Sequence, residues 1–171
     1  MRASRLNAGR AWLPALLLCV CVSAGAPAAA GAPAEARLEV HDADGARLVS
    51  LPMPEGEGWC LEWNHSVEGF AVLDCYRHRD GRMVLVRSHL PDFAAGLDHI
   101  PGRGRQVSDG EGGYWIEAID EPVPGNAYRL RVGAMRVDHR LVVDGERTSL
   151  SRLAANERVT IRLTPAAASP D

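Results

Sequence analysis

The chain has 171 residues, of which 46% are hydrophobic and 24% are charged, and its formal net charge is −3. All 19 basic residues are arginine, so a lysine Schiff base and a Walker-type phosphate loop are excluded. The acidic balance and the lack of a basic run argue against a partner that is nucleic acid or an anionic membrane.

The first 30 residues have the pattern of a secretory signal peptide. A basic start precedes the apolar stretch 11–22, and alanine-rich cleavage sites follow it. The apolar stretch is shorter than the ~20 residues that a transmembrane helix needs. We therefore expect a periplasmic or secreted protein, cleaved near residues 28–35, with no membrane insertion after cleavage. Loss of three arginines with the leader changes the net charge from −3 to −6. An uncleaved signal anchor is the alternative.

The rest of the chain predicts one all-β domain, an antiparallel sandwich or barrel of about nine short strands. We expect a linker at 31–36, the domain at 37–164 and a disordered tail at 165–171. Short alternating apolar runs are separated by four Asp-Gly pairs, which favour tight hairpin turns. The predicted strands are Leu38–His41, Arg47–Leu51, Trp59–His65, Phe70–Arg77, Met83–His89, Tyr114–Ile119, Tyr128–Val132, Met135–Val143 and Val159–Leu163.

Two segments do not fit this pattern. Pro91–Gly113 is rich in Gly, Asp and Pro, and a connection of this length is either functional or mobile. Ser149–Asn156 is compatible with one helical turn before the last strand.

The run from Trp59 to Tyr76 predicts a hairpin with a defined register. A turn at Val67-Glu68 pairs residues whose numbers sum to 135, which gathers aromatic side chains on one face. The pairs are Trp59 with Tyr76, Cys60 with Cys75, Trp63 with Val72, and His65 with Phe70. Val-Glu is a poor pair for a two-residue turn, so a wider loop is also compatible with the sequence.

Cys60 and Cys75 are therefore candidates for a disulfide in an exported protein. The two-residue turn makes them a hydrogen-bonded pair, where cross-strand bridges are often strained. Two reduced, buried thiols are the alternative.

Five motifs follow one another along the chain: Trp63-Asn64-His65-Ser66-Val67-Glu68, Asp74-Cys75-Tyr76-Arg77, Phe93-Ala94-Ala95-Gly96-Leu97, Gly112-Gly113-Tyr114-Trp115-Ile116 and Arg131-Val132-Gly133. Together they resemble the bacterial domain-of-unknown-function 1850 family, and the resemblance extends over about Leu38 to Leu163. Asp74 stands where relatives often carry Glu, and Gly69-Phe70-Ala71 departs from the expected pattern.

The resemblance implies a small exported β domain without enzymatic activity. Members of the family are often encoded beside the membrane subunits of tripartite ATP-independent periplasmic (TRAP) transporters, especially the TAXI type. The resemblance therefore implies an accessory role in transport.

The strongest candidate site is the hairpin tip, where His65, Ser66 and Glu68 could bind a small polar ligand together with Asp74. Asp98 and His99 could contribute from the following loop. The structural alternative is that these side chains satisfy backbone groups at the turn. Neither an HExxH nor a CxxC pattern is present, so we expect no metal site and no cofactor.

Two further groups have both a functional and a structural interpretation. Arg103 and Arg105 could clamp an anion, or they could belong to a solvated loop tip. Three tryptophans could line a pocket, but the hydrophobic core of a small domain needs such rings. They are Trp59, Trp63 and Trp115.

These observations favour an exported, non-enzymatic accessory domain. Its expected partners are TRAP/TAXI transporter subunits or a small polar ligand. One alternative is a periplasmic metal- or ligand-binding enzyme that uses the His65/Glu68 corner. The other is a structural module of the cell envelope.

Overall fold

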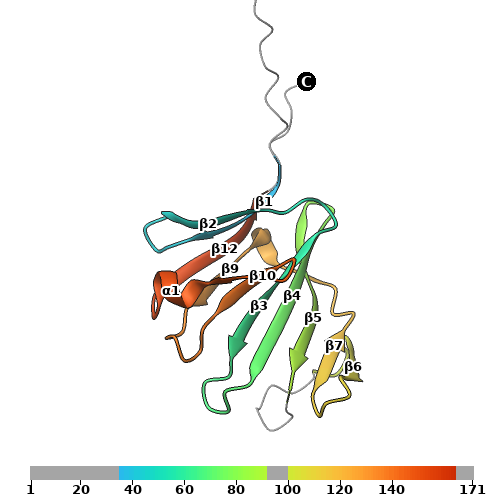
Figure 1. Ribbon diagram of the computed structural model, residues 1–171. Coiled ribbons are helices and arrows are strands. Elements are labelled where there is room, and N and C mark those ends of the chain that lie inside the picture. The colour runs from blue at the N-terminus through green and yellow to red at the C-terminus, as the bar shows by residue number, and fades with distance from the viewer. Residues whose placement is uncertain (1–34, 92–99, 165–171) are drawn as a thin grey trace, which may run out of the picture. The chain divides into compact units, whose positions relative to one another are not determined.

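The computed structural model describes residues 35–91 and 100–164 (Figure 1). Every described residue lies in one compact unit, for which contacts give the bounds Ala32–Asp171. The predicted signal peptide, most of the linker and the tail lie outside the described residues, as do Asp98 and His99. No helix in the described ranges has the length and apolar character needed to cross a membrane.

The first and last described strands pair in a four-stranded antiparallel sheet. Along the sheet, the order is β2 (Arg47–Pro52), β1 (Arg37–His41), β12 (Arg158–Thr164) and β9 (Ala127–Arg131). A short 3₁₀ turn, η2 (Pro124–Asn126), leads into β9, and the helix α1 (Leu150–Ala154) precedes β12.

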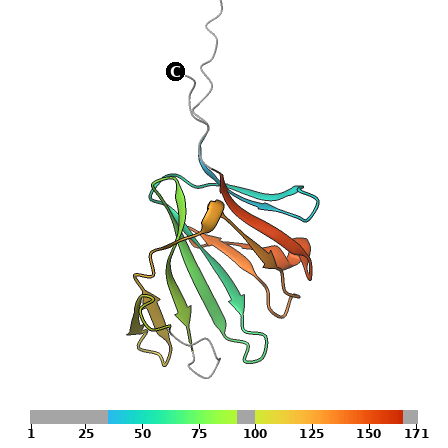
Figure 2. The same ribbon diagram turned by 180° about the vertical axis from the view of Figure 1, so that it is seen from behind.

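The remaining strands form an eight-stranded antiparallel sheet, seen from both sides in Figures 1 and 2. Its order is β11 (Glu146–Ser149), β10 (Arg140–Val143), β3 (Gly58–Asn64), β4 (Ala71–Arg79), β5 (Arg82–Leu90), β7 (Tyr114–Glu117) and β6 (Arg105–Ser108). The two-residue strand β8 (Glu121–Pro122) also pairs with β5.

Strand alternation supplies the core between the two sheets. Every second residue of β12 is buried. In the larger sheet, Trp59 of β3 stacks on its cross-strand partner Tyr76 of β4, with ring centroids 5.4 Å apart. A smaller cluster of Leu90, Tyr114 and Ile116 lies at the β5–β7 end of the larger sheet. The predicted all-β class is confirmed, and the architecture is an open sandwich.

The structure has more strands than the nine predicted, because three short strands lack an apolar pattern. β6 and β11 are polar, and β8 has two residues. β6 also gives structure to part of the predicted connection Pro91–Gly113. The predicted strand Met135–Val143 was too long, since the amides of Val137 and Asp138 bond back to Ala134 in a turn. The helical turn expected within Ser149–Asn156 is present as α1.

Two Asp-Gly pairs make the tight turns that the sequence predicts. Asp80 (φ 52°) and Gly81 (φ 69°) join β4 to β5, and Asp144 (φ 49°) and Gly145 (φ 83°) join β10 to β11. Positive φ at both central residues is the conformation of a type I′ hairpin turn.

The β3–β4 hairpin has the predicted register, and Cys60 and Cys75 form a disulfide. The loop is wider than two residues: the amide of His65 donates to Phe70 O, and the amide of Gly69 donates to His65 O. Because the loop is wider, the prediction that Cys60 and Cys75 form a hydrogen-bonded pair is wrong. The two cysteines form a non-hydrogen-bonded pair, in keeping with their short Cα–Cα distance of 4.0 Å.

Candidate functional site

A cleft of about 220 Å³ opens on the inner face of the eight-stranded sheet. The arrowhead ends of β3 and β5, which flank it, point away from β1 and β2 in Figure 1. The cleft combines one aromatic ring, three polar or charged side chains and an apolar floor. Its lining residues are Trp63, Val72, Asp74, Ser88, Leu90, Arg103 and Ile116.

Asp74 is the most distinctive group in the cleft. It lies opposite Ser88 in the β4–β5 ladder, and the Ser88 hydroxyl donates to Asp74 Oδ1 at 2.6 Å. Burial raises the pKa of Asp74, while the Ser88 hydrogen bond and the positive charge of Arg103 oppose this rise. None of the described groups donates a hydrogen bond to Oδ2.

Arg103 forms the rim between this cleft and a second hollow of about 210 Å³, which Tyr76 and Tyr128 also line. Its guanidinium donates to Glu121 Oε2 through Nε and Nη2, both at 2.8 Å. The two tyrosine rings stack 5.2 Å apart, and burial raises the pKa of both hydroxyls above their ordinary value. Both hydroxyls therefore stay protonated at neutral pH.

The predicted pair of Arg103 and Arg105 does not form a shared clamp. Arg105 lies in β6, where its Nη2 contacts Glu117 Oε2 at 3.0 Å, whereas Arg103 contacts Glu121. Gly104 between them has φ +71°, and a Cβ at this position would lie 2.6 Å from Glu117 O. The backbone therefore requires glycine here, and it carries the two arginines to different partners.

The hairpin tip holds three of the predicted site residues in local contacts. The backbone amide of Glu68 donates to His65 Nδ1 at 3.3 Å, and the His65 ring stacks on Phe70 with centroids 5.1 Å apart. Ser66 is exposed, and its carbonyl accepts a hydrogen bond from Arg136 at 3.4 Å. The bond between His65 and the Glu68 amide is of the kind that the structural alternative describes.

The four predicted site residues thus fall into two groups. His65, Ser66 and Glu68 lie together at the tip, whereas Asp74 bonds to Ser88 inside the cleft. No hydrogen bond or ion pair among the described residues joins Asp74 to the tip. Within the same part of the chain, no group of three or more His, Cys, Asp or Glu side chains is arranged to hold a metal ion.

Two cleft residues were not predicted to lie beside Asp74. Nothing in the sequence indicated Ser88, and Arg103 was expected to act with Arg105 or to belong to a solvated loop tip. Met83 and Leu85 point inward from β5, and strict alternation would then turn Ser88 outward. A bulge in the β4–β5 ladder, where Tyr76 pairs with Leu85 but Cys75 pairs with Arg87, reverses the phase. No local sequence pattern predicts this bulge, so the inward position of Ser88 could not be predicted from the sequence.

The three tryptophans have three different environments. Trp59 is 2% exposed and belongs to the core. Trp63 lines the cleft and stacks on His139 with ring centroids 6.0 Å apart. Trp115 lies on the outer face of the larger sheet, where the Arg87 guanidinium sits 4.3 Å from its ring centroid.

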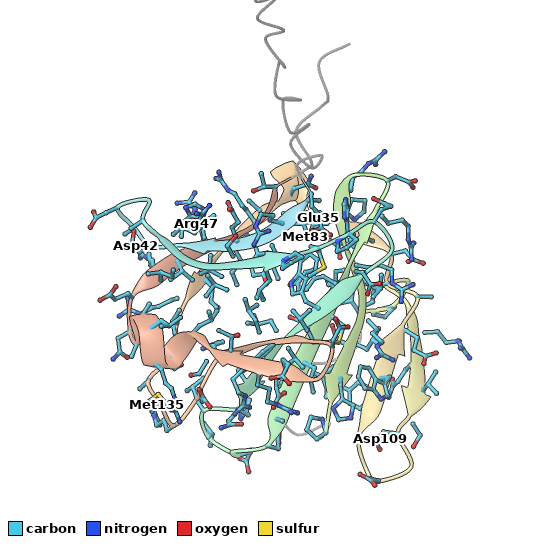
Figure 3. The ribbon with its side chains drawn as sticks, turned by 45° about the horizontal axis from the view of Figure 1, so that its top comes forward. Glu35, Asp42, Arg47, Met83, Asp109 and Met135 are labelled. Atoms are coloured by element: carbon cyan, nitrogen blue, oxygen red, sulfur yellow. A yellow bond between two sulfur atoms is a disulfide. The ribbon has the colours of Figure 1, made fainter. Side chains whose placement is uncertain are left out.

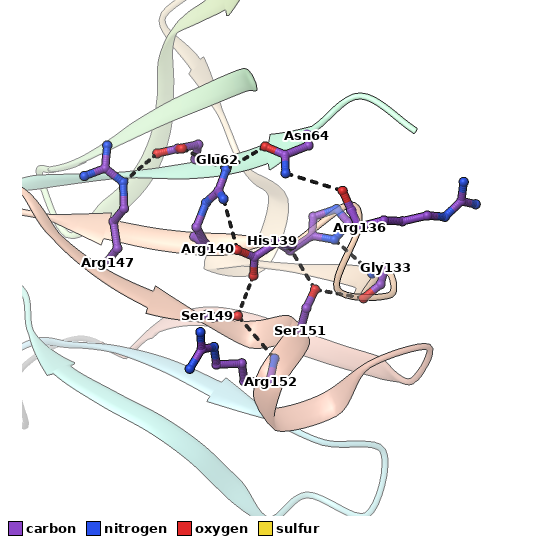
Figure 4. A network of polar contacts seen from close by, with 11 residues as sticks. Glu62, Asn64, Gly133, Arg136, His139, Arg140, Arg147, Ser149, Ser151 and Arg152 are labelled. Atoms are coloured by element: carbon purple, nitrogen blue, oxygen red, sulfur yellow. Dashed lines mark hydrogen bonds and ion pairs between the residues drawn. The ribbon is translucent and has the colours of Figure 1, made fainter. Parts of the chain in front are cut away.

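Behind Trp63, a polar network joins β3, β10, β11 and α1 (Figure 4). His139 Nδ1 accepts a hydrogen bond from the Gly133 amide at 2.9 Å, so this nitrogen is unprotonated. The Ser151 hydroxyl accepts from the His139 amide at 3.0 Å and donates to Gly133 O at 2.8 Å. This network holds one wall of the cleft in place.

The network predicts that stability decreases in mild acid. Burial lowers the pKa of His139 below 6.5, Arg140 adds to this effect, and Asp138 opposes it. Because the unfolded chain takes up this proton more readily, the free energy of unfolding should decrease as the pH falls below about 6.5. Urea unfolding at a series of pH values measures this slope.

The matched control is H139N, which keeps an acceptor for the Gly133 amide but does not titrate. Its pH dependence should be weaker than that of the wild type across the same range. Identical slopes for the two proteins would show that another group is responsible.

Comparison with protein families gives a match to the family described as Domain of unknown function (DUF1850), over residues 60–150. No curated protein and no solved structure matches the chain. The matched segment begins at Cys60 in β3 and ends at Leu150 in α1, so it includes Trp63, Asp74, Ser88 and Arg103. Because the match extends over more than half of the chain, the protein belongs to the DUF1850 family.

Proposed function

We propose that the protein is an exported, non-enzymatic binding module that holds a small polar ligand in the Asp74 cleft and assists a TRAP-type uptake system. The observation that carries the ligand-binding part is the partly buried carboxyl of Asp74, which lines the cleft and whose Oδ2 accepts no hydrogen bond from the described residues. A buried carboxylate without a full set of partners is costly, and a ligand that donates to it removes that cost.

The chemistry of the cleft favours a ligand with an ammonium group. Asp74 supplies a negative charge, Ser88 a hydroxyl and Trp63 an aromatic ring at the same cleft. A carboxylate and an indole ring both attract organic cations. Arg103 adds a positive charge at the rim, so a zwitterion such as an amino acid could place its carboxylate there.

Two lines of support concern location and partner. The Cys60–Cys75 disulfide is typical of proteins outside the reducing cytoplasm, and the first 30 residues have the pattern of an export signal. The resemblance to the DUF1850 family implies the link to TRAP/TAXI transporter subunits.

Replacement of Asp74 by asparagine should separate folding from ligand binding. Since the raised pKa of Asp74 means that its charged form is disfavoured in the fold, its contribution to stability is lost as the pH rises above 3.8. We expect D74N to be at least as stable as the wild type at about pH 7 and to lose this advantage at about pH 4. Urea unfolding at both pH values measures the difference.

Ligand binding can be tested with a panel of amino acids and small organic amines in thermal-shift and calorimetric titrations. A binding amine should raise the melting temperature of the wild type, and D74N should bind it about tenfold or more weakly. D120N is the matched control, because Asp120 is exposed and pairs with Arg79 outside the cleft. Equal binding by D74N, or no binding by any member of the panel, would contradict the assignment of the cleft.

The transport role has an independent test. Affinity purification of the tagged protein from its native host should recover the membrane subunits of a TRAP transporter, and deletion of the gene should reduce uptake of the transported solute. Normal uptake in the deletion strain, together with no recovered subunit, would contradict this role without affecting the ligand-binding proposal.

A further inference from the structure

The outer face of the four-stranded sheet is strongly basic. Although the chain as a whole is acidic, this face carries six of its 19 arginines and, from the strands themselves, one of its 22 acidic residues, Glu39. The arginines come from all four strands: Arg37, Arg47, Arg129, Arg131, Arg158 and Arg162. We call this surface the basic face.

Strand alternation explains why the arginines gather there. In β12, Val159, Ile161 and Leu163 are buried, so Arg158 and Arg162 must point outward. The same alternation turns Arg129 and Arg131 outward from β9. In the sequence these arginines stand one at a time and never form a basic run.

The register leaves most of the positive charges on the basic face without a carboxylate partner among the described residues. Arg131 lies directly opposite Arg158, and like charges at such positions are destabilising. Glu39 accepts from Arg47 at 3.0 Å and from Thr164 at 3.2 Å, and it contacts His41. The four arginines of β9 and β12 are exposed, and no carboxylate among the described residues forms an ion pair with them.

The composition of the basic face distinguishes between two kinds of partner. A protein interface usually has an apolar centre surrounded by a polar rim. Here the other outward positions are mostly polar, and only Pro52 and Ala127 are apolar. The polar ones are Glu39, His41 and the hydroxyl residues Ser50, Thr160 and Thr164. Guanidinium groups with neighbouring hydroxyls suit phosphate groups that are spread over a surface.

We propose that the basic face docks the protein onto an anionic phospholipid surface. Figure 3 shows Arg47 at this sheet with its side chain directed away from the interior. The acidic remainder of the protein is repelled by the same lipids, so the basic face is the side that turns toward them. This is association at the surface, without insertion, and it does not depend on the function proposed for the cleft.

Vesicle co-sedimentation of the unit Ala32–Asp171 tests this proposal. We expect binding to phosphatidylcholine vesicles with about 30% phosphatidylglycerol to be about tenfold or more stronger than to phosphatidylcholine alone. Binding should decrease as the salt concentration rises from about 0.05 M to about 0.5 M. Equal binding to both vesicles would overturn the proposal.

Charge reversal locates the surface. R129E/R158E should weaken binding to the anionic vesicles by about tenfold or more, and R131Q/R162Q is a second, milder pair. The control R82E/R152E changes the net charge of the protein equally at exposed arginines outside the basic face. Circular dichroism and urea unfolding confirm that each variant folds.

Three further results would overturn the proposal. The first is wild-type binding by R129E/R158E, and the second is an equal loss in R82E/R152E, which would reflect net charge alone. The third is tight binding of polyglutamate through the same arginines, which would assign the face to an acidic protein. Binding that depends on the basic face and on anionic lipid supports it.

Discussion

Replacement of Arg140 by methionine is expected to lower the free energy of unfolding by about 3 kcal/mol. The Arg140 guanidinium contacts Glu62 at 2.8 Å, and both Asn64 and Asp138 at 3.0 Å, with its side chain 16% exposed (Figure 4). Methionine has a similar length but leaves these acceptors buried without their shared donor. Urea unfolding of R140M measures the loss.

The matched control is R147M. Arg147 contacts the same Glu62 at 3.2 Å, but its side chain is 60% exposed, so its loss should cost less than about 1 kcal/mol. Equal losses for the two variants would mean that burial does not decide the strength of these ion pairs. A stable R140M would contradict a structural role for the network.

Loss of the Cys60–Cys75 disulfide is expected to cost a similar amount, about 3 kcal/mol. The bridge joins residues with a sequence separation of 15. Without it, the unfolded chain gains conformational entropy, and for a loop of this length that gain lowers the stability of the fold by about 3 kcal/mol. C60A/C75A should therefore unfold at a lower urea concentration than the oxidised wild type.

Wild-type protein reduced with dithiothreitol is the control for this prediction, since it loses the cross-link but keeps both side chains. It should resemble C60A/C75A, and reduction should leave the variant unchanged. If the oxidised wild type is no more stable than C60A/C75A, the disulfide contributes nothing to the fold.

The β3–β4 hairpin shows how far local sequence rules reach. Alternating aromatic residues and two cysteines pointed to one register, and the structure has it. Turn chemistry was equally informative where Asp-Gly pairs occur, because few other residue pairs adopt positive φ twice in succession. The width of the loop at Val67-Glu68 was harder to predict, since no residue there demands one turn type.

The candidate site was only partly accessible from sequence. Asp74 was chosen together with His65, Ser66 and Glu68 because they are close along the chain. Its hydrogen-bond partner is Ser88, which is brought inward by a strand bulge, and its charged neighbour is Arg103 from a distant loop. Bulges and loop paths depend on packing between strands, which no short sequence window contains.

The sequence by itself determined the all-β class and the hairpin register, which places Cys60 opposite Cys75, because alternation and turn preference act between near neighbours. Only the tertiary structure decided where charge gathers. The composition of an acidic chain argued against anionic surfaces, yet pairing of β1, β2, β9 and β12 places six arginines on one face. The net charge of a protein sums the charges of all its faces, whereas an anionic lipid surface interacts mainly with the one face that is turned toward it.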